Sequence, residues 1–412
     1  MNILLVNKYY YVTGGPESYM FNVTSKLEEL GHTVYPLCLD VEQNIESEYS
    51  KYFISSPYPE RQSHHAPGSG LGTQAKLFLR SIYSREAARK TQQMIDDFDI
   101  DIVYCLNIAN YISPSVIDVG KKNGKRVLHR LSDYNMVCPQ QYFYKHKKVC
   151  LECKSSLLRA IPDRCVKQSL PATVGRVVSM KLHRLLKLYE KVDAFICPSS
   201  FMRDQLVELG MGANRVHYLP SLVNVDSKPD EQALRSDRSY VLYLGRLSVE
   251  KGLDYLLDAM DQPGNEDIPL VLAGVGPEME ALQAQARGLK NRNIEFRGFV
   301  QREELDELLQ GSAFTVAPSI WHDNSPMSVF ESLAAGKAVI ATPLGGLRDQ
   351  VGDEEAGLFV EPNDSESLGK AINRLWNDDD LRETLSRGAY HRFATHFDPE
   401  MHMSGLLKLM TA

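Results

Sequence analysis

The sequence of 412 residues has only seven cysteines and two tryptophans, and it has no long apolar run. A membrane-spanning helix needs about 18 or more consecutive apolar residues, and no segment provides them. The first residues, Met1–Lys8, lack the basic and long apolar regions of a secretory signal. We therefore expect a cytoplasmic protein whose cysteines are reduced rather than joined in disulfides.

An excess of basic residues is also missing. Lys and Arg number 46 and Asp and Glu number 53, which gives a formal net charge of −7. Because a nucleic-acid-binding domain is usually strongly basic, we expect no nucleic-acid partner. The chain is 43% apolar and 24% charged, as soluble globular proteins are, and this excludes disorder as its main state.

Short apolar runs alternate with amphipathic stretches along almost the whole chain. Strands are predicted at residues 3–6, 34–39, 102–106, 127–131, 194–197, 240–244, 270–273, 294–296, 314–316 and 338–341. Strands that alternate with helices indicate parallel sheets covered on both faces. Since one open sheet rarely takes ten strands, we predict an α/β protein with two Rossmann-like doubly wound domains. The break between them is expected near residues 218–226, before a polar stretch at 227–239.

Two loops at predicted strand ends carry candidate phosphate-binding groups. Gly14 and Gly15 follow the first strand and precede a helix, whose N-terminus favours an anion. A tight turn without a ligand explains the two glycines equally. Arg246 and Lys251 follow the strand at 240–244, where ligands bind in open parallel sheets, and they could clamp a diphosphate. The alternative is that both are ordinary surface cations.

A third segment, residues 321–336, combines two carboxylates with a short helix. Ser325 is predicted to cap a helix that begins at Pro326 and ends at Gly336. Asp323 precedes this helix and Glu331 lies inside it. A buried carboxylate needs hydrogen-bond donors, and ribose hydroxyls would supply them. The alternative places the carboxylate of Glu331 at an exposed helix edge.

Taken in order, these segments resemble family 4 of the retaining glycosyltransferases. The resemblance is carried by Gly14-Gly15, by residues 245–252, and by an acidic residue eight positions before Glu331. It implies the GT-B architecture, in which two Rossmann-like domains face a cleft. Residues 1–222 would then bind the acceptor, with a C-terminal helix at 392–412 packing back on them. Residues 223–391 would bind a nucleotide-sugar donor.

The same resemblance assigns roles by matching position. Arg246 and Lys251 would hold the donor diphosphate, and Glu331 would accept hydrogen bonds from ribose hydroxyls. Many members carry Glu where this chain has Asp323, so the reach toward donor-sugar hydroxyls is shorter. Cations and helix amides can stabilise the leaving diphosphate, so no catalytic metal is expected. The other donor contacts would come from Gly14, Gly15, Gly298, Phe299, Val300, Ser325, Pro326 and Met327.

Residues 127–139 resemble a family segment on the acceptor side. In that segment a His often directly precedes an Asp–aromatic pair, whereas here Ser132 precedes Asp133 and His129 lies three residues upstream. Which of these side chains faces the sugar is left open. His129 is equally explained as a hydrogen-bonded histidine at a strand end.

Four cysteines form a symmetrical pattern, C-x11-C-x2-C-x11-C. One structural zinc held by four thiolates would explain it. Buried thiols or a redox pair are the alternatives. The four are Cys138, Cys150, Cys153 and Cys165.

Basic residues are concentrated in the stretch Gln141–Lys191. Twelve Lys and Arg stand there against three acidic residues, a balance of +9 in an acidic protein. Apolar residues are interleaved with Lys181, Arg184 and Lys187, as in a helix lying on an anionic membrane surface. A helix packed on the core with its basic side in solvent has the same pattern.

From these observations we expect an enzyme that transfers a sugar, with retention, from a nucleoside diphosphate sugar to an acceptor hydroxyl. A lipid-linked glycan at the inner face of the cell membrane, in surface-polysaccharide assembly, is the expected acceptor. The alternatives are a GT-B nucleotide-sugar epimerase and a catalytically silent subunit that binds nucleotide sugars.

Overall fold

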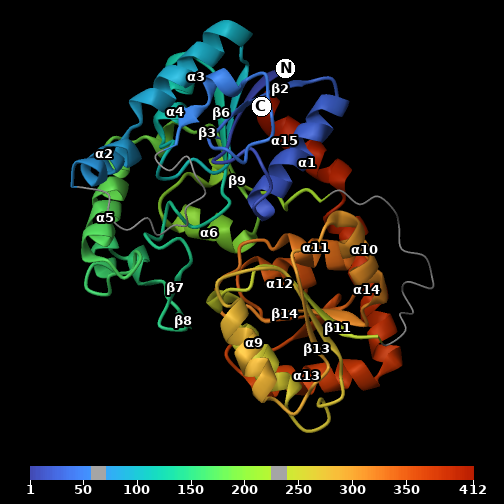
Figure 1. The fold of residues 1–412 in the computed structure, drawn as a ribbon. Coiled ribbons are helices and arrows are strands. Elements are labelled where there is room, and N and C mark those ends of the chain that lie inside the picture. The colour runs from blue at the N-terminus through green and yellow to red at the C-terminus, as the bar shows by residue number, and fades with distance from the viewer. Residues whose placement is uncertain (57–70, 224–238) are drawn as a thin grey trace. The chain divides into compact units, whose positions relative to one another are not determined.

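The computed structural model describes residues 1–56, 71–223 and 239–412, which divide into two α/β units (Figure 1). The first unit comprises Met1–Tyr142, Leu151–Leu222 and His402–Ala412. The second comprises Phe143–Cys150 and Val223–Met401. The polar stretch predicted after the break lies, apart from its last residue, outside the described residues. Among those described, no helix is both long and apolar enough to cross a membrane.

The first unit is built on a six-stranded parallel sheet with the order β10-β9-β6-β5-β1-β2. These strands are β1 (Asn2–Val6), β2 (Thr33–Leu37), β5 (Ile102–Cys105), β6 (Arg126–Arg130), β9 (Ala194–Cys197) and β10 (Val216–Tyr218). The helices are α1 (Gly15–Glu29), α2 (Leu71–Ile82), α3 (Arg85–Phe98), α4 (Ser115–Lys122), α5 (Leu170–Leu185), α6 (Ser200–Glu208) and α15 (Pro399–Thr411). A short pair joins β3 (Leu39–Asp40) to β4 (Ile54–Ser55).

The second unit repeats this plan with the strand order β13-β12-β11-β14-β15-β16, again all parallel. Its strands are β11 (Val241–Leu244), β12 (Leu270–Ala273), β13 (Ile294–Gly298), β14 (Phe314–Ala317), β15 (Val339–Ala341) and β16 (Gly357–Phe359). Its helices are α8 (Leu253–Met260), α9 (Met279–Gly288), α10 (Arg302–Gly311), α11 (Met327–Ala334), α12 (Gly346–Val351), α13 (Ser365–Asn377) and α14 (Asp379–His396). The antiparallel hairpin of β7 (Tyr144–Lys145) and β8 (Lys148–Val149) also belongs to this unit.

Short 3₁₀ helices join several of these elements. They are η1 (Ser50–Tyr52), η2 (Glu152–Lys154), η3 (Leu157–Ala160), η4 (Tyr189–Lys191), η5 (Ala213–Arg215) and η6 (Val249–Lys251).

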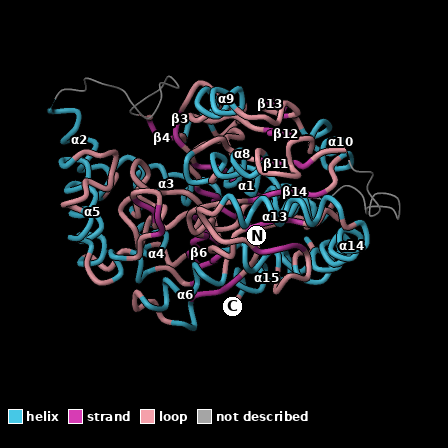
Figure 2. The backbone as a smooth tube through the Cα atoms, turned by 90° about the horizontal axis from the view of Figure 1, so that it is seen from below, coloured by secondary structure: helices cyan, strands magenta, loops and turns pink. Residues whose placement is uncertain are grey.

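Both faces of each sheet are buried, because successive side chains of a strand point to opposite sides. In β11, Val241 and Tyr243 enter the core cluster formed with α8 and α13, which lie beside the strands in Figure 2. Leu242 and Leu244 enter a different cluster with Leu308 of α10. For this reason the strands appear in the sequence as continuous apolar runs. The prediction of doubly wound α/β domains is confirmed.

All ten predicted strands are present, but two edge strands escaped sequence analysis. β10 and β16 have three residues each, and His217 in β10 and Gly357 in β16 interrupt the apolar pattern. The end of the chain also differs from the expected helix at 392–412. Phe393 and Phe397 pack into the core of the second unit, so α14 stays with that unit. The return to the first unit begins at His402.

His402 holds the C-terminal segment on the first unit through a network of buried hydrogen bonds. Its Nδ1 lies 2.6 Å from the carbonyl oxygen of Pro220, and a carbonyl can only accept a hydrogen bond, so Nδ1 carries the proton. Burial lowers the pKa of His402 to about 3, so the ring is neutral and Nε2 accepts from the Tyr19 hydroxyl at 3.1 Å. The hydroxyl of Tyr104 in turn donates to that of Tyr19 at 2.7 Å. These hydrogen bonds connect Pro220, just before the break between the two units, to side chains of α15, α1 and β5.

Two further histidines of the first unit are also buried and neutral. His129 on β6 points Nδ1 at the carbonyl of Cys105, 3.2 Å away, and burial lowers its pKa to about 4. His183 on α5 donates through Nε2 to carbonyls of α2, and burial lowers its pKa to about 4 as well.

We predict that the first unit loses stability on mild acidification. The unfolded histidines take up protons below pH 6.5, whereas His129, His183 and His402 stay neutral in the fold until about pH 4 or below. Because the unfolded state binds more protons in this window, the free energy of unfolding falls as the pH drops through it. The raised carboxyl pKa values of Glu17 and Asp133 oppose this trend, but they are two groups against three. Urea unfolding across the window measures the slope.

The variant His402→Phe removes one of the three groups and should flatten that slope. His391→Phe is the matched control, because His391 is exposed on α14. An unfolding free energy that stays constant from pH 6.5 to about 4 would contradict the prediction.

Candidate functional site

The strand order of the second unit reverses between β11 and β14. Ligands of open parallel sheets bind beyond the carboxyl ends of the strands at such a point. The loops after these two strands, residues 245–252 and 318–326, lie against each other. The amide of Ile320 donates to the carbonyl of Glu250 at 3.0 Å. A Cβ at Gly252, whose φ is +69°, would lie 2.2 Å from the carbonyl oxygen of Pro318, so only glycine fits.

Lys251 and Asp323 form an ion pair that joins these two loops. Their side chains are only 18% and 7% exposed, and the hydroxyl of Ser319 donates to the same carboxylate oxygen of Asp323 at 3.1 Å. The ammonium group of Lys251 also lies 5.6 Å from the ring centre of Trp321. Lys251 is therefore not an ordinary surface cation, and Asp323 has a partner within the chain that its sequence position did not reveal.

The backbone of Asp323 is held as firmly as its side chain. Its carbonyl accepts from the amide of Gly346 at 2.7 Å. A Cβ at Gly345, whose φ is +62°, would come within 2.3 Å of that carbonyl oxygen. Arg246, by contrast, is exposed immediately after β11, so its guanidinium is accessible at the same sheet edge.

The helix that carries Glu331 does not begin at the predicted residue. α11 begins at Met327 with Pro326 in the N-cap position, and no side chain caps it, so the predicted cap by Ser325 is wrong. Because Pro326 has an extended backbone conformation, it forms the boundary itself. The uncapped amides give this helix start the partial positive charge that favours an anion.

Glu331 is partly buried rather than placed at an exposed helix edge. Burial raises the pKa of its carboxyl, and Arg302 opposes that rise. One guanidinium nitrogen of Arg302 lies 3.7 Å from the Glu331 carboxylate. Arg302 was not singled out by sequence, because the pair joins α10 to α11, two separate helices.

Apolar side chains are exposed where β12 and β13 end. Phe299 is 64% exposed directly after Gly298, which closes β13 with a φ of +73°. Val275, after β12, is 50% exposed, and the amide of Gly274 donates to the carbonyl of Gly298 at 2.7 Å. Val300 packs into the cluster with α10. The predicted contacts at 298–300 do not include Val275, although the glycines on both sides of it are a signal in the sequence.

In the first unit, α1 begins at Gly15 with Gly14 in the N-cap position. No atom would lie within 4 Å of a Cβ at Gly14, apart from its chain neighbours. Glu17 is buried in the first turn of α1, where it accepts from the Thr13 hydroxyl at 2.7 Å. Gly14 thus faces open space, and the turn beside it already contains the carboxylate of Glu17. The contact of Gly14 with the nucleotide-sugar donor stays a prediction.

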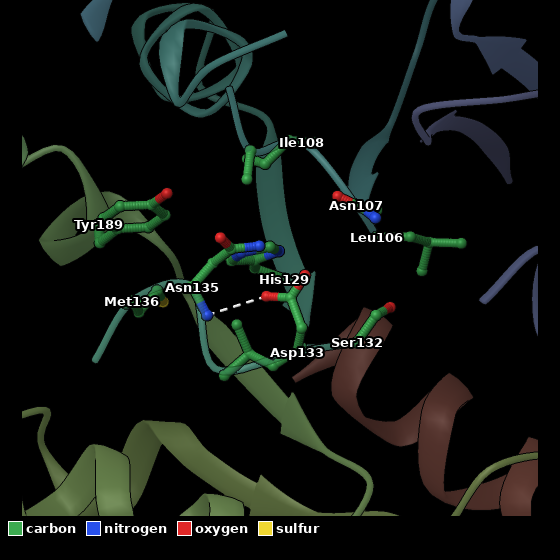
Figure 3. Close-up of a pocket in the computed structure, with 11 residues that line it drawn as sticks. Leu106, Asn107, Ile108, His129, Ser132, Asp133, Asn135, Met136 and Tyr189 are labelled. Atoms are coloured by element: carbon green, nitrogen blue, oxygen red, sulfur yellow. Dashed lines mark hydrogen bonds between the residues drawn. The ribbon is translucent and has the colours of Figure 1, made fainter. Parts of the chain in front are cut away.

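The three predicted acceptor-side residues, His129, Ser132 and Asp133, line one pocket beyond the carboxyl ends of β5 and β6 (Figure 3). Since Nδ1 of His129 donates to a carbonyl, the Nε2 of this neutral ring is an acceptor. Burial raises the pKa of Asp133 to about 6, and Oδ1 of its carboxylate accepts from the Asn135 amide at 2.9 Å. A carboxylate and a neutral imidazole are suited to receive hydroxyl groups.

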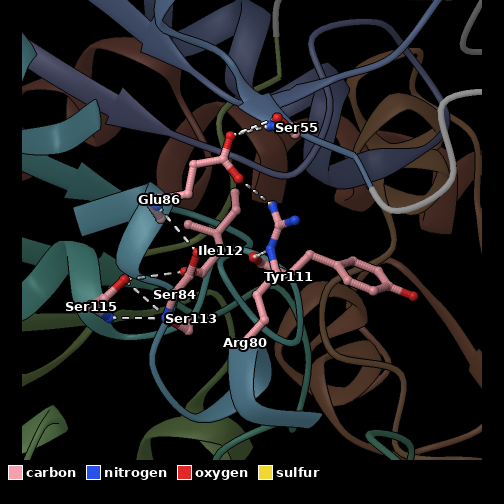
Figure 4. A network of polar contacts seen from close by, with 9 residues as sticks. Ser55, Arg80, Ser84, Glu86, Tyr111, Ile112, Ser113 and Ser115 are labelled. Atoms are coloured by element: carbon pink, nitrogen blue, oxygen red, sulfur yellow. Dashed lines mark hydrogen bonds and ion pairs between the residues drawn. The ribbon is translucent and has the colours of Figure 1, made fainter. Parts of the chain in front are cut away.

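The loop after β5, on the other wall of this pocket, is fixed from outside by a polar network (Figure 4). Nε of Arg80 donates to the carbonyl of Tyr111 at 2.8 Å, and the amide of Ser84 donates to the hydroxyl of Ser113 at 2.8 Å. Arg80 also lies 3.8 Å from the carboxylate of Glu86. These bonds tie the loop to α2 and α3.

The four cysteines are not gathered into one group in this structure, and the structural zinc stays a prediction. No group of three or more His, Cys, Asp or Glu side chains that could hold a metal ion occurs among the residues that the structure describes. Cys153 is buried in an apolar cluster with Leu157, Val177 and Met180, against which Cys165 packs.

The two units, each a doubly wound parallel sheet, define the GT-B class of fold. Sucrose-phosphate synthase from Thermosynechococcus elongatus covers 99% of this chain and 98% of its own, with a TM-score of 0.73 and 19% identity. HepE from Anabaena, solved in complex with UDP, covers 100% of both chains with a TM-score of 0.67 and 16% identity. At these identities the likeness concerns the fold.

The family follows from the second half of the chain. Residues 224–392 match the family model of the glycosyl transferases group 1, so the second unit is a group 1 glycosyltransferase domain. The phosphatidyl-myo-inositol mannosyltransferase of Mycobacterium leprae is 33% identical over 47% of this chain and 53% of its own length. The chain spans about half the length of the curated relatives it matches.

The ion pair at the strand reversal leads to a stability prediction. Lys251→Ala should lower the free energy of unfolding by about 1–3 kcal/mol, because it leaves the buried Asp323 carboxylate without its cation. Arg246→Ala is the matched variant and should change it by less than about 0.5 kcal/mol, since its side chain is exposed. Urea unfolding of the two variants measures the difference. Equal effects would show that the pair does not hold the loops together.

Proposed function

We propose that this protein transfers a sugar from a nucleoside diphosphate sugar to an acceptor hydroxyl, with retention of the anomeric configuration. The observation that carries the proposal is the Lys251–Asp323 pair beside the exposed Arg246, at the strand reversal of a group 1 glycosyltransferase domain. The nucleotide of the HepE complex supports the class of donor.

In this proposal the chain stabilises charge that develops on the leaving group. As the bond between the anomeric carbon and the phosphate oxygen breaks, negative charge grows on the diphosphate. Arg246, Lys251 and the uncapped amides of α11 supply positive charge for it. The acceptor oxygen forms its new bond to the same face of the anomeric carbon, and its proton passes to the departing phosphate. Asp323 orients the ammonium of Lys251, and Glu331 receives the ribose hydroxyls.

The acceptor hydroxyl group is assigned to the pocket of the first unit. His129 and Asp133 present two hydrogen-bond acceptors there, which suit the hydroxyls of a glycan. Measuring donor consumption with and without a panel of glycan acceptors tests the activity. Consumption only with acceptor supports transfer. Consumption without acceptor would indicate an epimerase, and binding without consumption would indicate a silent subunit.

Glu331→Gln should weaken the binding of a bare nucleoside diphosphate by about 10-fold to 100-fold. This is the cost of one charge-assisted hydrogen bond to a ribose hydroxyl, about 1.5–3 kcal/mol. Isothermal titration with UDP and the other nucleoside diphosphates measures it. Glu303→Gln, at an exposed position of α10, is the control. Unchanged affinity in Glu331→Gln would remove the ribose assignment.

We further propose that the acceptor is lipid-linked and that α5 docks on the inner face of the cell membrane, in surface-polysaccharide assembly. The exposed residues of α5 and of the two positions that follow it form what we call the docking face. Its apolar members are Leu170, Val174, Val178, Leu185 and Leu186, and its cations are Lys181, Arg184 and Lys187.

The docking face combines the two attractions that bind a helix to an anionic membrane. Leu170, Val174, Val178 and Leu185 repeat at helical spacing, and Leu185 is 76% exposed. Exposed apolar area enters the interface, while each basic residue near an anionic surface adds about 1 kcal/mol. Val177 of the same helix is buried, so α5 packs on the unit with one side and presents the other to its surroundings.

We expect binding to vesicles of equal parts phosphatidylglycerol and phosphatidylcholine, and weaker binding as salt is added, because exposed charges are screened. Replacing Lys181, Arg184 and Lys187 with Gln should reduce this binding about 100-fold or more, since about 3 kcal/mol of attraction is lost. Co-sedimentation measures the bound fraction.

The control carries the same loss of charge elsewhere in the first unit, with Gln at Lys26, Lys51 and Arg89. It should bind vesicles nearly as the unmodified protein does, apart from the change in net charge. Absence of vesicle binding at low salt would contradict the docking face and would indicate a soluble acceptor.

A further inference from the structure

The buried face of α5 carries a guanidinium that reaches the acceptor pocket. Nη2 of Arg176 donates to the backbone carbonyl of Asn135 at 2.8 Å and to its side-chain Oδ1 at 2.9 Å. The amide of Asn135 then donates to Oδ1 of Asp133 at 2.9 Å, the contact drawn in Figure 3. Three hydrogen bonds thus run from a helix to a carboxylate that lines the pocket.

This arrangement fixes Asn135 more tightly than a single bond would. One nitrogen holds both oxygens of Asn135, so neither its side chain nor its peptide can turn without breaking a charge-assisted bond. Arg184 reaches the same loop one residue further on, with Nη2 lying 3.4 Å from the carbonyl of Met136. Asn135 and Met136 both line the pocket, so α5 holds this wall at two points.

The charged groups around Asp133 also connect its carboxylate to Arg176. Arg176 and Lys8, from the loop after β1, are the cations that act on its carboxylate, and both lower its pKa against the effect of burial. The other titratable groups near the pair are neutral. His129 is uncharged because burial lowers its pKa, and burial raises the pKa of Tyr189 to about 12. Cys138 and His183 also interact electrostatically with Arg176.

We propose that Arg176 is a positioning residue of the acceptor site, which holds Asn135 and through it orients the Asp133 carboxylate toward the acceptor hydroxyl. The assignment of an acceptor hydroxyl to this pocket rests on the proposed function. Since the docking face lies on the same helix, α5 would connect the surface that meets a lipid-linked acceptor to the loop that receives its hydroxyl.

The experiment compares Arg176→Met and Arg176→Lys with the unmodified protein. The pKa of Asp133 is followed by carbon NMR of labelled aspartate carboxyls, assigned with Asp133→Asn. Hydrogen exchange reports on the amide of Asn135. Arg89→Met is the matched control, because it removes one exposed arginine from another helix of the same unit.

In Arg176→Met the pKa of Asp133 should rise by about 1, as expected when a nearby opposite charge is lost, and the Asn135 amide should exchange at least tenfold faster. Arg176→Lys keeps the charge, but its ammonium ends one bond short of Nη2, the nitrogen that makes both bonds to Asn135. Its Asp133 pKa should therefore stay near that of the unmodified protein, while the Asn135 amide still exchanges faster. Arg89→Met should change neither quantity.

An unchanged pKa of Asp133 together with unchanged exchange at Asn135 in Arg176→Met would overturn the proposal. Should that variant fail to fold, Arg176→Lys decides, and unchanged exchange at Asn135 would overturn it there. These measurements need no donor, acceptor or vesicle, so they stand even when no transfer is detected, which would instead contradict the proposed function. Where transfer is measured, Arg176→Lys should raise KM for the acceptor and leave KM for the donor unchanged.

Discussion

Parallel strand pairing is the constraint on which the rest of this structure depends. Every strand of a parallel sheet must be followed by a crossover, so the loops that leave the carboxyl ends gather at one edge. The strands themselves are buried on both faces and have no room for chemistry. Polar groups therefore collect where the backbone leaves the sheet, and both candidate sites occupy such an edge. The Lys251–Asp323 pair follows β11 and β14, and the pocket with His129 follows β5 and β6.

Charges at these edges are partly withdrawn from water, and each is held by a partner from another segment. Lys251 pairs with Asp323, Glu331 faces Arg302, and Arg176 holds Asn135 beside Asp133. A buried pair contributes little net stability, because desolvation offsets much of the attraction. What it does provide is a defined geometry, since removing one partner leaves the other buried and uncompensated. Such defined geometry is what a site for a charged donor requires.

The insertion between β6 and α5 shows how one sequence signal can serve a different purpose. Its cysteine pattern suggested a metal, yet the structure uses Cys153 as an apolar side chain in a small cluster under α5. That cluster supports the helix whose outer side is the docking face and whose inner side carries Arg176. Apolar packing by Leu157, Val177 and Met180 in this insertion thus helps to position both surfaces.

The sequence by itself determined the two doubly wound sheets, because buried parallel strands need continuous apolar runs and the chain has ten of them. It also determined which loops carry the polar groups, since strand ends can be read from where those runs stop. Only the tertiary structure decided how these groups are paired. Asp323 lies 72 residues from Lys251, and Arg176 lies 41 residues from Asn135. No periodicity or local motif records such contacts, because they depend on how separate helices and loops pack at the edge of the sheet.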